Sequence, residues 1–387
     1  MSADTVEKLS LPAADFALNL LRTACSPTDN AFMSPMSISV ALAMTYLGAA
    51  DSTKAQINQI MFKGMSDSEV HSAMSELVRV LGAQKAEGHQ LSMANRIYSQ
   101  QGFELVDEFK KGMKHHYDSE LLLVDFVSNA AAVAAEVNRW VEERTNNRIK
   151  NLLSPDALDA LTRIVLVNAI YFKGSWRHQF KARATHKQTF YCAPDKEVQV
   201  DMMHQTESFA DNQDHPVQVL GLPYQHRDLA MYILLPKEKF GLAAFEKSLT
   251  GQKLLDYINN TRTERVAVSL PSFKLEQEFE LKSALSLMGM DEMFGPVADF
   301  TSMAQNIKKG DLYVSKVIHK AFVETTEQGT EAAAATAVAI ACYAAMFDAG
   351  LQKPIDFVAD HQFVIAIVWQ MRTVLFLGHL VQLDAQP

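Results

Sequence analysis

E-Q-G-T-E-A-A-A-A-T-A-V-A-I, at residues 327–340, is the stretch on which the interpretation of this chain depends. Six of its fourteen residues are alanine, and from Ala332 to Ala337 no side chain is larger than that of threonine. Composition alone favours an alanine-rich helix. In an extended conformation, alternate residues share one uncharged face: Thr330, Ala332, Ala334, Thr336, Val338 and Ile340. Such a segment can enter the interior of a sheet without burying an ion.

The residues before this stretch favour the extended interpretation. Residues 312–324, L-Y-V-S-K-V-I-H-K-A-F-V-E, alternate in a way that is typical of a mostly buried strand. Together with the alanine-rich stretch, they resemble the strand and hinge that lead into the reactive-centre loop of the serpins. The tail resembles the same family, with F-V-A-D-H-Q-F at residues 357–363 and F-L-G-H at residues 376–379.

The bulk composition is that of a globular protein with ample core. Of 387 residues, 48% are hydrophobic and 21% are charged. The net charge of -9 argues against nucleic-acid binding, which needs a basic face. The three cysteines, Cys25, Cys192 and Cys342, form no C-x-x-C pair, which fits a reducing compartment. No secretion signal or membrane-spanning run is recognised, so we expect a cytoplasmic protein without membrane contact.

Periodicity predicts helices over residues 12–24, 36–47, 67–81 and 131–147. The helix at 36–47 is apolar nearly all round and follows Ser34-Pro35, so we expect a buried helix with a serine N-cap. Strands are predicted over residues 91–98, 163–173, 229–235 and 266–270, with a closing hairpin at 363–369 and 374–379. The family resemblance covers residues 14–379. It implies an α+β fold in a single domain (1–387), with three β-sheets, about eight or nine helices and an exposed reactive-centre loop at 327–354.

Motifs of hydrolases, nucleotide-binding proteins and zinc enzymes are absent, so we predict no enzyme, no metal and no cofactor. His319 and Ser34 suggest a hydrolase dyad only superficially, because one lies inside a strand and the other caps a helix. The resemblance instead assigns Ser34, Ser37, Asn168 and His319 to the polar "shutter" beneath the central strands. It assigns Trp176 to the "breach", where loop insertion begins.

The resemblance implies suicide inhibition of a protease, in which the cut loop inserts into the sheet as a new strand and traps the covalent acyl-enzyme. The hinge residues would be Glu327, Gly329, Thr330, Glu331, Ala332, Ala333, Ala334, Ala335 and Thr336. We expect residues 330–340 to join the sheet only after cleavage. The small, uncharged inward side chains are what an inhibitory hinge requires, whereas non-inhibitory relatives often carry bulky or charged residues there.

The bait bond follows from the span that is usual in the family. Seventeen residues counted from Glu327 end at Tyr343, which places the bond at Tyr343–Ala344 and favours chymotrypsin-like proteases. Residues 344–354 look several residues longer than usual, so Met346 and Phe347 remain alternatives. Cys342, next to the bait, is a candidate for oxidation or a simple small residue.

Two other functions remain open. One is a non-inhibitory serpin, acting as a chaperone or carrier, and the other is an inhibitor of cysteine proteases. The family's heparin-binding helix corresponds to residues 67–81, which carry Asp67, Glu69 and Glu76 against Arg79. We therefore expect no strong heparin site. The target protease is the expected partner, and the protein itself is expected to be a monomer.

Overall fold

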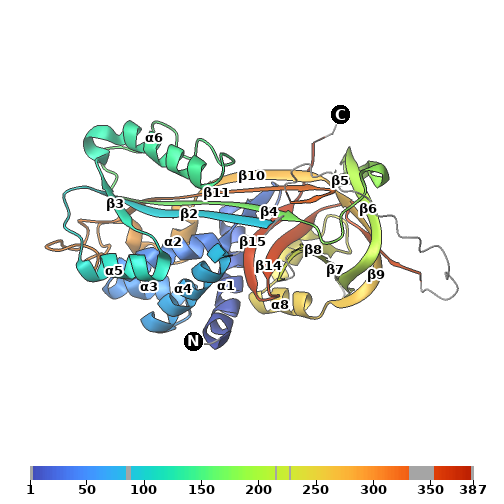
Figure 1. Ribbon diagram of the computed structural model, residues 1–387, viewed down its shortest axis with the longest axis horizontal. Helices are drawn as coiled ribbons and strands as arrows, with labels where there is room; N and C mark the ends of the chain where they lie inside the picture. Colours follow the sequence, from blue (N-terminus) through green and yellow to red (C-terminus); the bar gives the residue numbers. More distant parts are fainter. Residues whose placement is uncertain (1–2, 84–88, 214–215, 226–227, 331–352, 385–387) are drawn as a thin grey trace.

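A computed structural model describes residues 3–83, 89–213, 216–225, 228–330 and 353–384. Its helices lie largely on one side of a six-stranded sheet, and a second, nine-stranded sheet packs at the other end of the molecule (Figure 1). The described α-helices are α1 (Ala3–Ala24), α2 (Pro35–Gly48), α3 (Asp51–Met61), α4 (Asp67–Ala83), α5 (Asp107–Tyr117), α6 (Phe126–Arg144), α7 (Leu242–Ser248), α8 (Gly251–Asn259) and α9 (Lys282–Leu287). Two 3-10 turns are η1 (Ala182–Ala184) and η2 (Glu292–Phe294).

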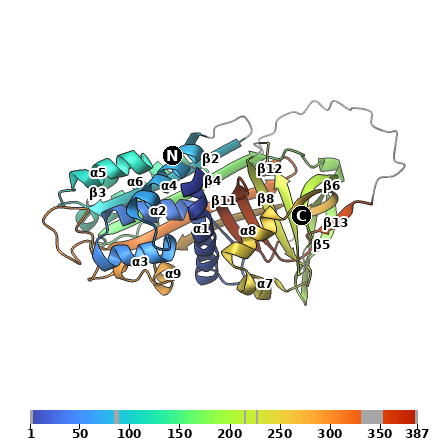
Figure 2. The same ribbon diagram turned by 90° about the horizontal axis from the view of Figure 1, so that it is seen from below.

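The six-stranded sheet has the order β10-β11-β12-β4-β2-β3. Its strands are β10 (Phe273–Glu280), β11 (Val314–Thr326), β12 (Gly329–Thr330), β4 (Ile164–Ser175), β2 (His89–Gln100) and β3 (Leu121–Val124). β11 and β4 also pair with each other directly, in parallel, beyond the end of the short β12. Figure 2 shows β12 at one end of this sheet.

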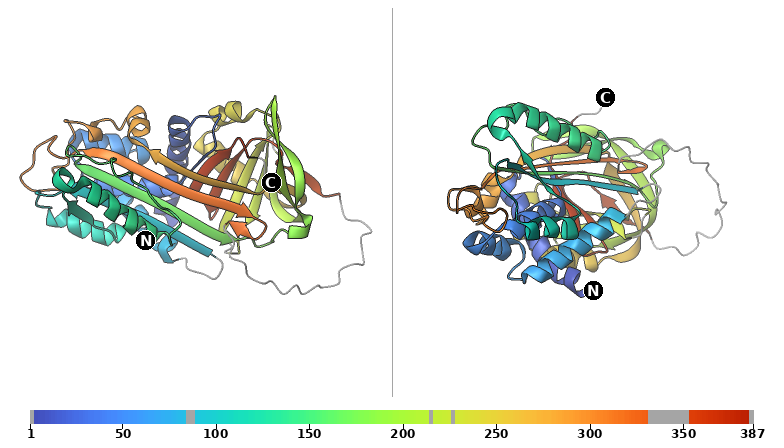
Figure 3. Two further views of the ribbon diagram at one scale, coloured as in Figure 1. Left: turned by 90° about the horizontal axis from the view of Figure 1, so that it is seen from above. Right: turned by 60° about the vertical axis from the view of Figure 1, so that its left-hand side comes forward.

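The two faces of this sheet belong to different cores. Ile170 and Leu166 of β4 face the main core, which they share with α1 and α2. Val167 and Ala169 alternate with them and face a smaller core under α6. Helix α6 lies across that face of the sheet (Figure 3, left). A strand buried on both faces explains the continuous apolar run predicted as a strand at residues 163–173.

The nine-stranded sheet follows the path β1-β15-β14-β8-β7-β6-β9-β13, with β5 paired to β6. Its strands are β1 (Ala31–Met33), β15 (Thr373–Leu380), β14 (Phe363–Trp369), β8 (Leu229–Pro236), β7 (Val217–Pro223), β6 (Lys196–Asn212), β9 (Arg262–Pro271), β13 (Ile355–Val358) and β5 (His186–Ala193). The expected three sheets appear in the described residues as two hydrogen-bonded networks. The long β6 pairs with β9 along most of its length and with β7 at Ala210, Asp211 and Asn212, which joins two sheets into one.

The predicted α+β architecture is confirmed, and the bounds of α1 and α6 differ most from prediction. α1 begins at Ala3 rather than at residue 12, and Pro12 lies inside it. Burial of Leu9 in the core favours this longer helix despite the proline. α6 begins at Phe126 because Asp125 caps it by accepting a hydrogen bond from the Ser128 backbone N–H (2.9 Å). It ends at Arg144 rather than at residue 147, since Asn146 and Asn147 have positive φ.

Buried α2 has the predicted cap. The Ser34 hydroxyl accepts a hydrogen bond from the Ser37 backbone N–H at 3.2 Å, and Pro35 occupies the first turn. Every residue of α2 except Leu47 is buried, as expected for a helix without a polar face. Among the described residues, no helix is long and apolar enough to cross a membrane, and no group of three or more His, Cys, Asp or Glu side chains could hold a metal ion.

Candidate functional site at the seam of the six-stranded sheet

Three polar side chains occupy one cross-strand row of the six-stranded sheet. His319 of β11 lies opposite Asn168 of β4, and Asn168 lies opposite Asn95 of β2. The N-terminus of α2 brings Ser34 and Ser37 against this row from the main core. All four residues assigned to the shutter therefore meet where β11 and β4 join, and Asn95 completes the cluster.

Both ring nitrogens of His319 have a partner. Nε2 accepts a hydrogen bond from the Ser34 backbone N–H at 3.0 Å, and Nδ1 donates to the side-chain oxygen of Asn168. The ring is fully buried, and burial lowers the pKa of His319 to about 3. The ring is therefore neutral at physiological pH, with the tautomer fixed by its two neighbours.

The serines connect α2 to the sheet. The Ser34 hydroxyl donates to the backbone carbonyl of Leu375 (2.6 Å), so it does not bond to the His319 ring as a hydrolase dyad would require. The amide nitrogen of Asn168 donates to the Ser37 hydroxyl (2.6 Å), and that hydroxyl donates to the Asn95 side chain (3.0 Å). These side chains satisfy one another's hydrogen-bonding groups, which is typical of a structural cluster rather than of a catalytic site.

Trp176 lies beyond the end of β4, where the hinge approaches the sheet. Its indole stacks on Tyr224, with ring centroids 4.7 Å apart and planes inclined by 13°. The indole N–H donates to the carbonyl of Thr326 (2.9 Å), and the Trp176 backbone N–H donates to the carbonyl of Gln328 (2.9 Å). The Trp176–Tyr224 pair thus fixes the turn that precedes β12.

The first hinge residues are already part of the sheet. Gly329 and Thr330 pair with Thr326 and Thr325 of β11 on one side, and with Ser175 and Gly174 of β4 on the other. A Cβ on Gly329 would lie 2.1 Å from the Gly174 carbonyl oxygen, and its φ is +149°, so only glycine fits here.

Thr330 is fully buried, and its hydroxyl is hydrogen-bonded to the Tyr224 hydroxyl at 2.7 Å. The expectation that Thr330 enters the sheet only after cleavage is therefore wrong. Glu327 is held as well, since its carboxylate accepts from the Thr185 hydroxyl (2.7 Å) and its carbonyl accepts from the Phe180 backbone N–H (2.8 Å).

The remaining predicted site residues lie outside the described residues. They are Glu331, Ala332, Ala333, Ala334, Ala335, Thr336, Cys342, Tyr343, Ala344, Met346 and Phe347. Sequence reasoning missed Asn95 and Tyr224. Asn95 could have been found from its place inside the predicted strand at 91–98, because burying a side-chain amide in a strand costs free energy unless the amide is hydrogen-bonded.

The sequence and the fold were compared with those of known proteins. The model of the family "Serpin (serine protease inhibitor)" matches residues 12–383. The chain belongs to the serpin family.

Ipis-1 of Ixodes persulcatus is 41% identical over 358 residues, which is 92% of each chain. Leukocyte elastase inhibitor of Sus scrofa is 38% identical over 390 residues, covering 97% of this chain and 99% of the relative. The crystal structure of human thyroxine-binding globulin complexed with thyroxine aligns with a TM-score of 0.85 at 29% identity, covering 98% of this chain and 99% of that one. The family thus includes a protein named as a protease inhibitor and another named as a small-molecule binder.

Proposed function

We propose that this protein inhibits a chymotrypsin-like serine protease by the suicide mechanism, with loop insertion after cleavage at Tyr343–Ala344. One observation carries the proposal: Gly329 and Thr330 form a two-residue strand between β11 and β4. Cleavage of the loop would release the residues that follow to extend this strand. The uncharged side chains at 332, 334 and 336 offer no ion that would resist burial.

Extension of the observed register gives the proposal a specific geometry. Since Thr330 lies opposite Thr325 and Gly174, the inserted strand would place Thr336 opposite both His319 and Asn168. Insertion would separate these two side chains by one strand width, roughly 5 Å more than now, and break their hydrogen bond. The Thr336 hydroxyl can donate to one and accept from the other, which keeps the seam satisfied in the inserted state.

The proposal is tested by incubating the protein with chymotrypsin and separating the products on a denaturing gel. We expect a covalent adduct that survives SDS, at near one-to-one stoichiometry, and a released C-terminal fragment that begins at Ala344. A fragment that begins after Met346 or Phe347 would instead assign the bait bond to that residue. Chymotrypsin with its catalytic serine blocked is the control, and it should form no adduct.

The alternatives predict different results in the same assay. A cysteine-protease inhibitor would trap papain-like enzymes and leave chymotrypsin active. A carrier of the kind named among the relatives would be cut by both classes without any adduct. If every protease with aromatic or methionine specificity only digests the loop, inhibition is wrong for this chain. The cytoplasmic location, the monomeric state and the absence of a strong heparin site stay predictions.

A further inference from the structure

A cavity of about 610 Å³ lies on the nine-stranded sheet, away from the shutter. Two cross-strand rows form its floor: Ala210, Gly221 and Tyr232 in one, and Pro223, Ala230 and Val368 in the other. A Cβ on Gly221 would meet Tyr232 Cε1 at 2.9 Å and Ala210 Cβ at 3.0 Å. The absence of a side chain at Gly221 therefore leaves room for the Tyr232 ring and adds to the depth of the cavity.

Tyr232 is the residue of the cavity lining that carries a phenolic hydroxyl. The residue is 4% exposed, and its hydroxyl has no hydrogen-bond partner among the described residues. Burial raises the pKa of Tyr232 to about 12, so the hydroxyl keeps its proton and can donate. Its position in the wall of a cavity indicates a ligand acceptor.

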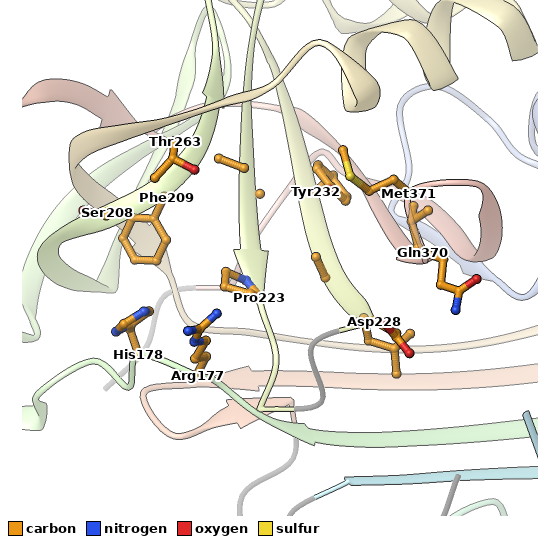
Figure 4. A pocket seen from close by; sticks show the side chains of 15 residues that line it. Arg177, His178, Ser208, Phe209, Pro223, Asp228, Tyr232, Thr263, Gln370 and Met371 are labelled. Atoms are coloured by element: carbon orange, nitrogen blue, oxygen red, sulfur yellow. The ribbon is translucent and has the colours of Figure 1, made fainter. Parts of the chain in front are cut away.

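The two ends of the cavity differ in charge. Arg177 and His178 lie at one end, and Asp228, Gln370 and Met371 at the other (Figure 4). Arg177 forms no ion pair with any residue that the structure describes.

The Arg177 backbone is fixed by the hydrogen bond from its N–H to the Pro223 carbonyl (2.9 Å). The His178 ring meets Phe209 edge to face, with centroids 6.0 Å apart and planes at 88°. An unpaired guanidinium beside an imidazole and an aromatic ring is a suitable environment for an organic anion.

We propose that this cavity binds a small amphipathic organic anion, a carboxylate or sulfonate with a flat apolar body. Its charged group would contact the Arg177 guanidinium beside His178, and its body would lie over Pro223 and Ala230. An acceptor atom of the ligand would receive the Tyr232 hydroxyl proton. The volume lies within the ~300–1,000 Å³ typical of small-molecule sites, which combine apolar walls with a few polar groups.

Titration of the intact protein with anilinonaphthalene sulfonate, followed by probe fluorescence, tests the site. N-phenylnaphthylamine is the matched probe without the sulfonate. We expect one sulfonate site per chain. Arg177→Gln should weaken sulfonate binding about tenfold or more and leave the uncharged probe unaffected, since hydrogen bonds to charged groups are the strong ones. Arg183→Gln, at an exposed arginine of η1 outside the cavity, is the control and should change neither probe.

Tyr232→Phe separates a binding role from a structural one. Removal of a hydroxyl that forms no hydrogen bond with the described residues should not lower the melting temperature of the free protein, and should weaken sulfonate binding roughly threefold to tenfold. Equal sulfonate affinity in wild type and Arg177→Gln overturns the proposal. So does a Tyr232→Phe variant that melts lower and binds the probe normally. No protease is used and the loop is intact, so the result is independent of whether the protein inhibits one.

Discussion

Cleavage of the reactive-centre loop should raise the stability of this protein, and the structure allows the gain to be estimated. β11 and β4 pair directly at eight register positions below the hinge, from Val314 opposite Ile164 to Phe322 opposite Tyr171. An inserted strand would replace this single ladder by two, for a net gain of about eight backbone hydrogen bonds. At roughly 0.5–1.5 kcal/mol each, the gain is ~4–12 kcal/mol, comparable to the ~5–15 kcal/mol of an ordinary domain.

The assay compares thermal unfolding of the intact and the loop-cleaved protein by circular dichroism. A chain of 387 residues unfolds with an entropy of about 0.8 kcal/mol/K near the midpoint. The estimated gain therefore corresponds to a rise in melting temperature of about 5–15 °C. Burial of the inserted side chains adds to this value.

Two arginine variants make the measurement specific. In the extended register, Ala334 lies opposite Ala321 and Ile170, which face the main core. Ala334→Arg would place an unpaired cation there, at a cost of several kcal/mol, and should abolish the rise. Ala349→Arg, beyond all three candidate bait bonds, should preserve it. Equal melting temperatures for intact and cleaved wild type, or a full rise in cleaved Ala334→Arg, would refute loop insertion in this chain.

Three further predictions concern single side chains of the hinge, the bait and the seam. Thr336→Val should lower the melting temperature of the cleaved form by about 1–4 °C and leave the intact form unchanged, because His319 and Asn168 lose a shared partner worth ~1–3 kcal/mol only in the inserted state. Tyr343→Arg should transfer inhibition from chymotrypsin to trypsin, whose acidic pocket binds a cation, and a gel that still shows the chymotrypsin adduct would contradict the bait assignment. His319→Gln should flatten the pH dependence of the free energy of unfolding. In wild type, between pH 6.5 and about 3, the His319 imidazole binds a proton in the unfolded chain but not in the folded protein. The contribution of His319 to stability is therefore complete above pH 6.5 and is lost on acidification, with a slope of up to ~1.4 kcal/mol per pH unit. Urea unfolding from about pH 7 to pH 4 measures that slope, and identical slopes would show that His319 does not titrate as stated.

Local patterns made much of this fold predictable. α2 could be recognised because Ser34-Pro35 begins a helix whose side chains are apolar all round, and β4 because its apolar run is as long as a strand buried on both faces. The hinge was predicted because its inward positions carry no charge, and beyond Thr330 it stays a prediction. These features are properties of adjacent residues, which a single sequence displays directly.

Features that depend on register were not predictable in the same way. Asn95 belongs to the polar cluster because β2 lies beside β4. Tyr224 belongs to the hinge end of the sheet because it stacks on Trp176. The cavity likewise depends on Ala210, Gly221 and Ala230 lying on neighbouring strands. Each of these residues is ordinary in its own segment, so only the pairing of distant strands reveals them.

The position of Gly329 and Thr330 between β11 and β4 also has a kinetic consequence for the proposed inhibition. A new strand normally needs a nucleus, whose ends must be brought together at a cost in chain entropy. Here that nucleus exists before any protease arrives, because two residues already pair on both sides. Insertion would then be propagation from an existing start, and its rate would depend on how fast the next β11–β4 pair opens. We expect substitutions along that ladder to set the outcome of the race between trapping and release of the protease.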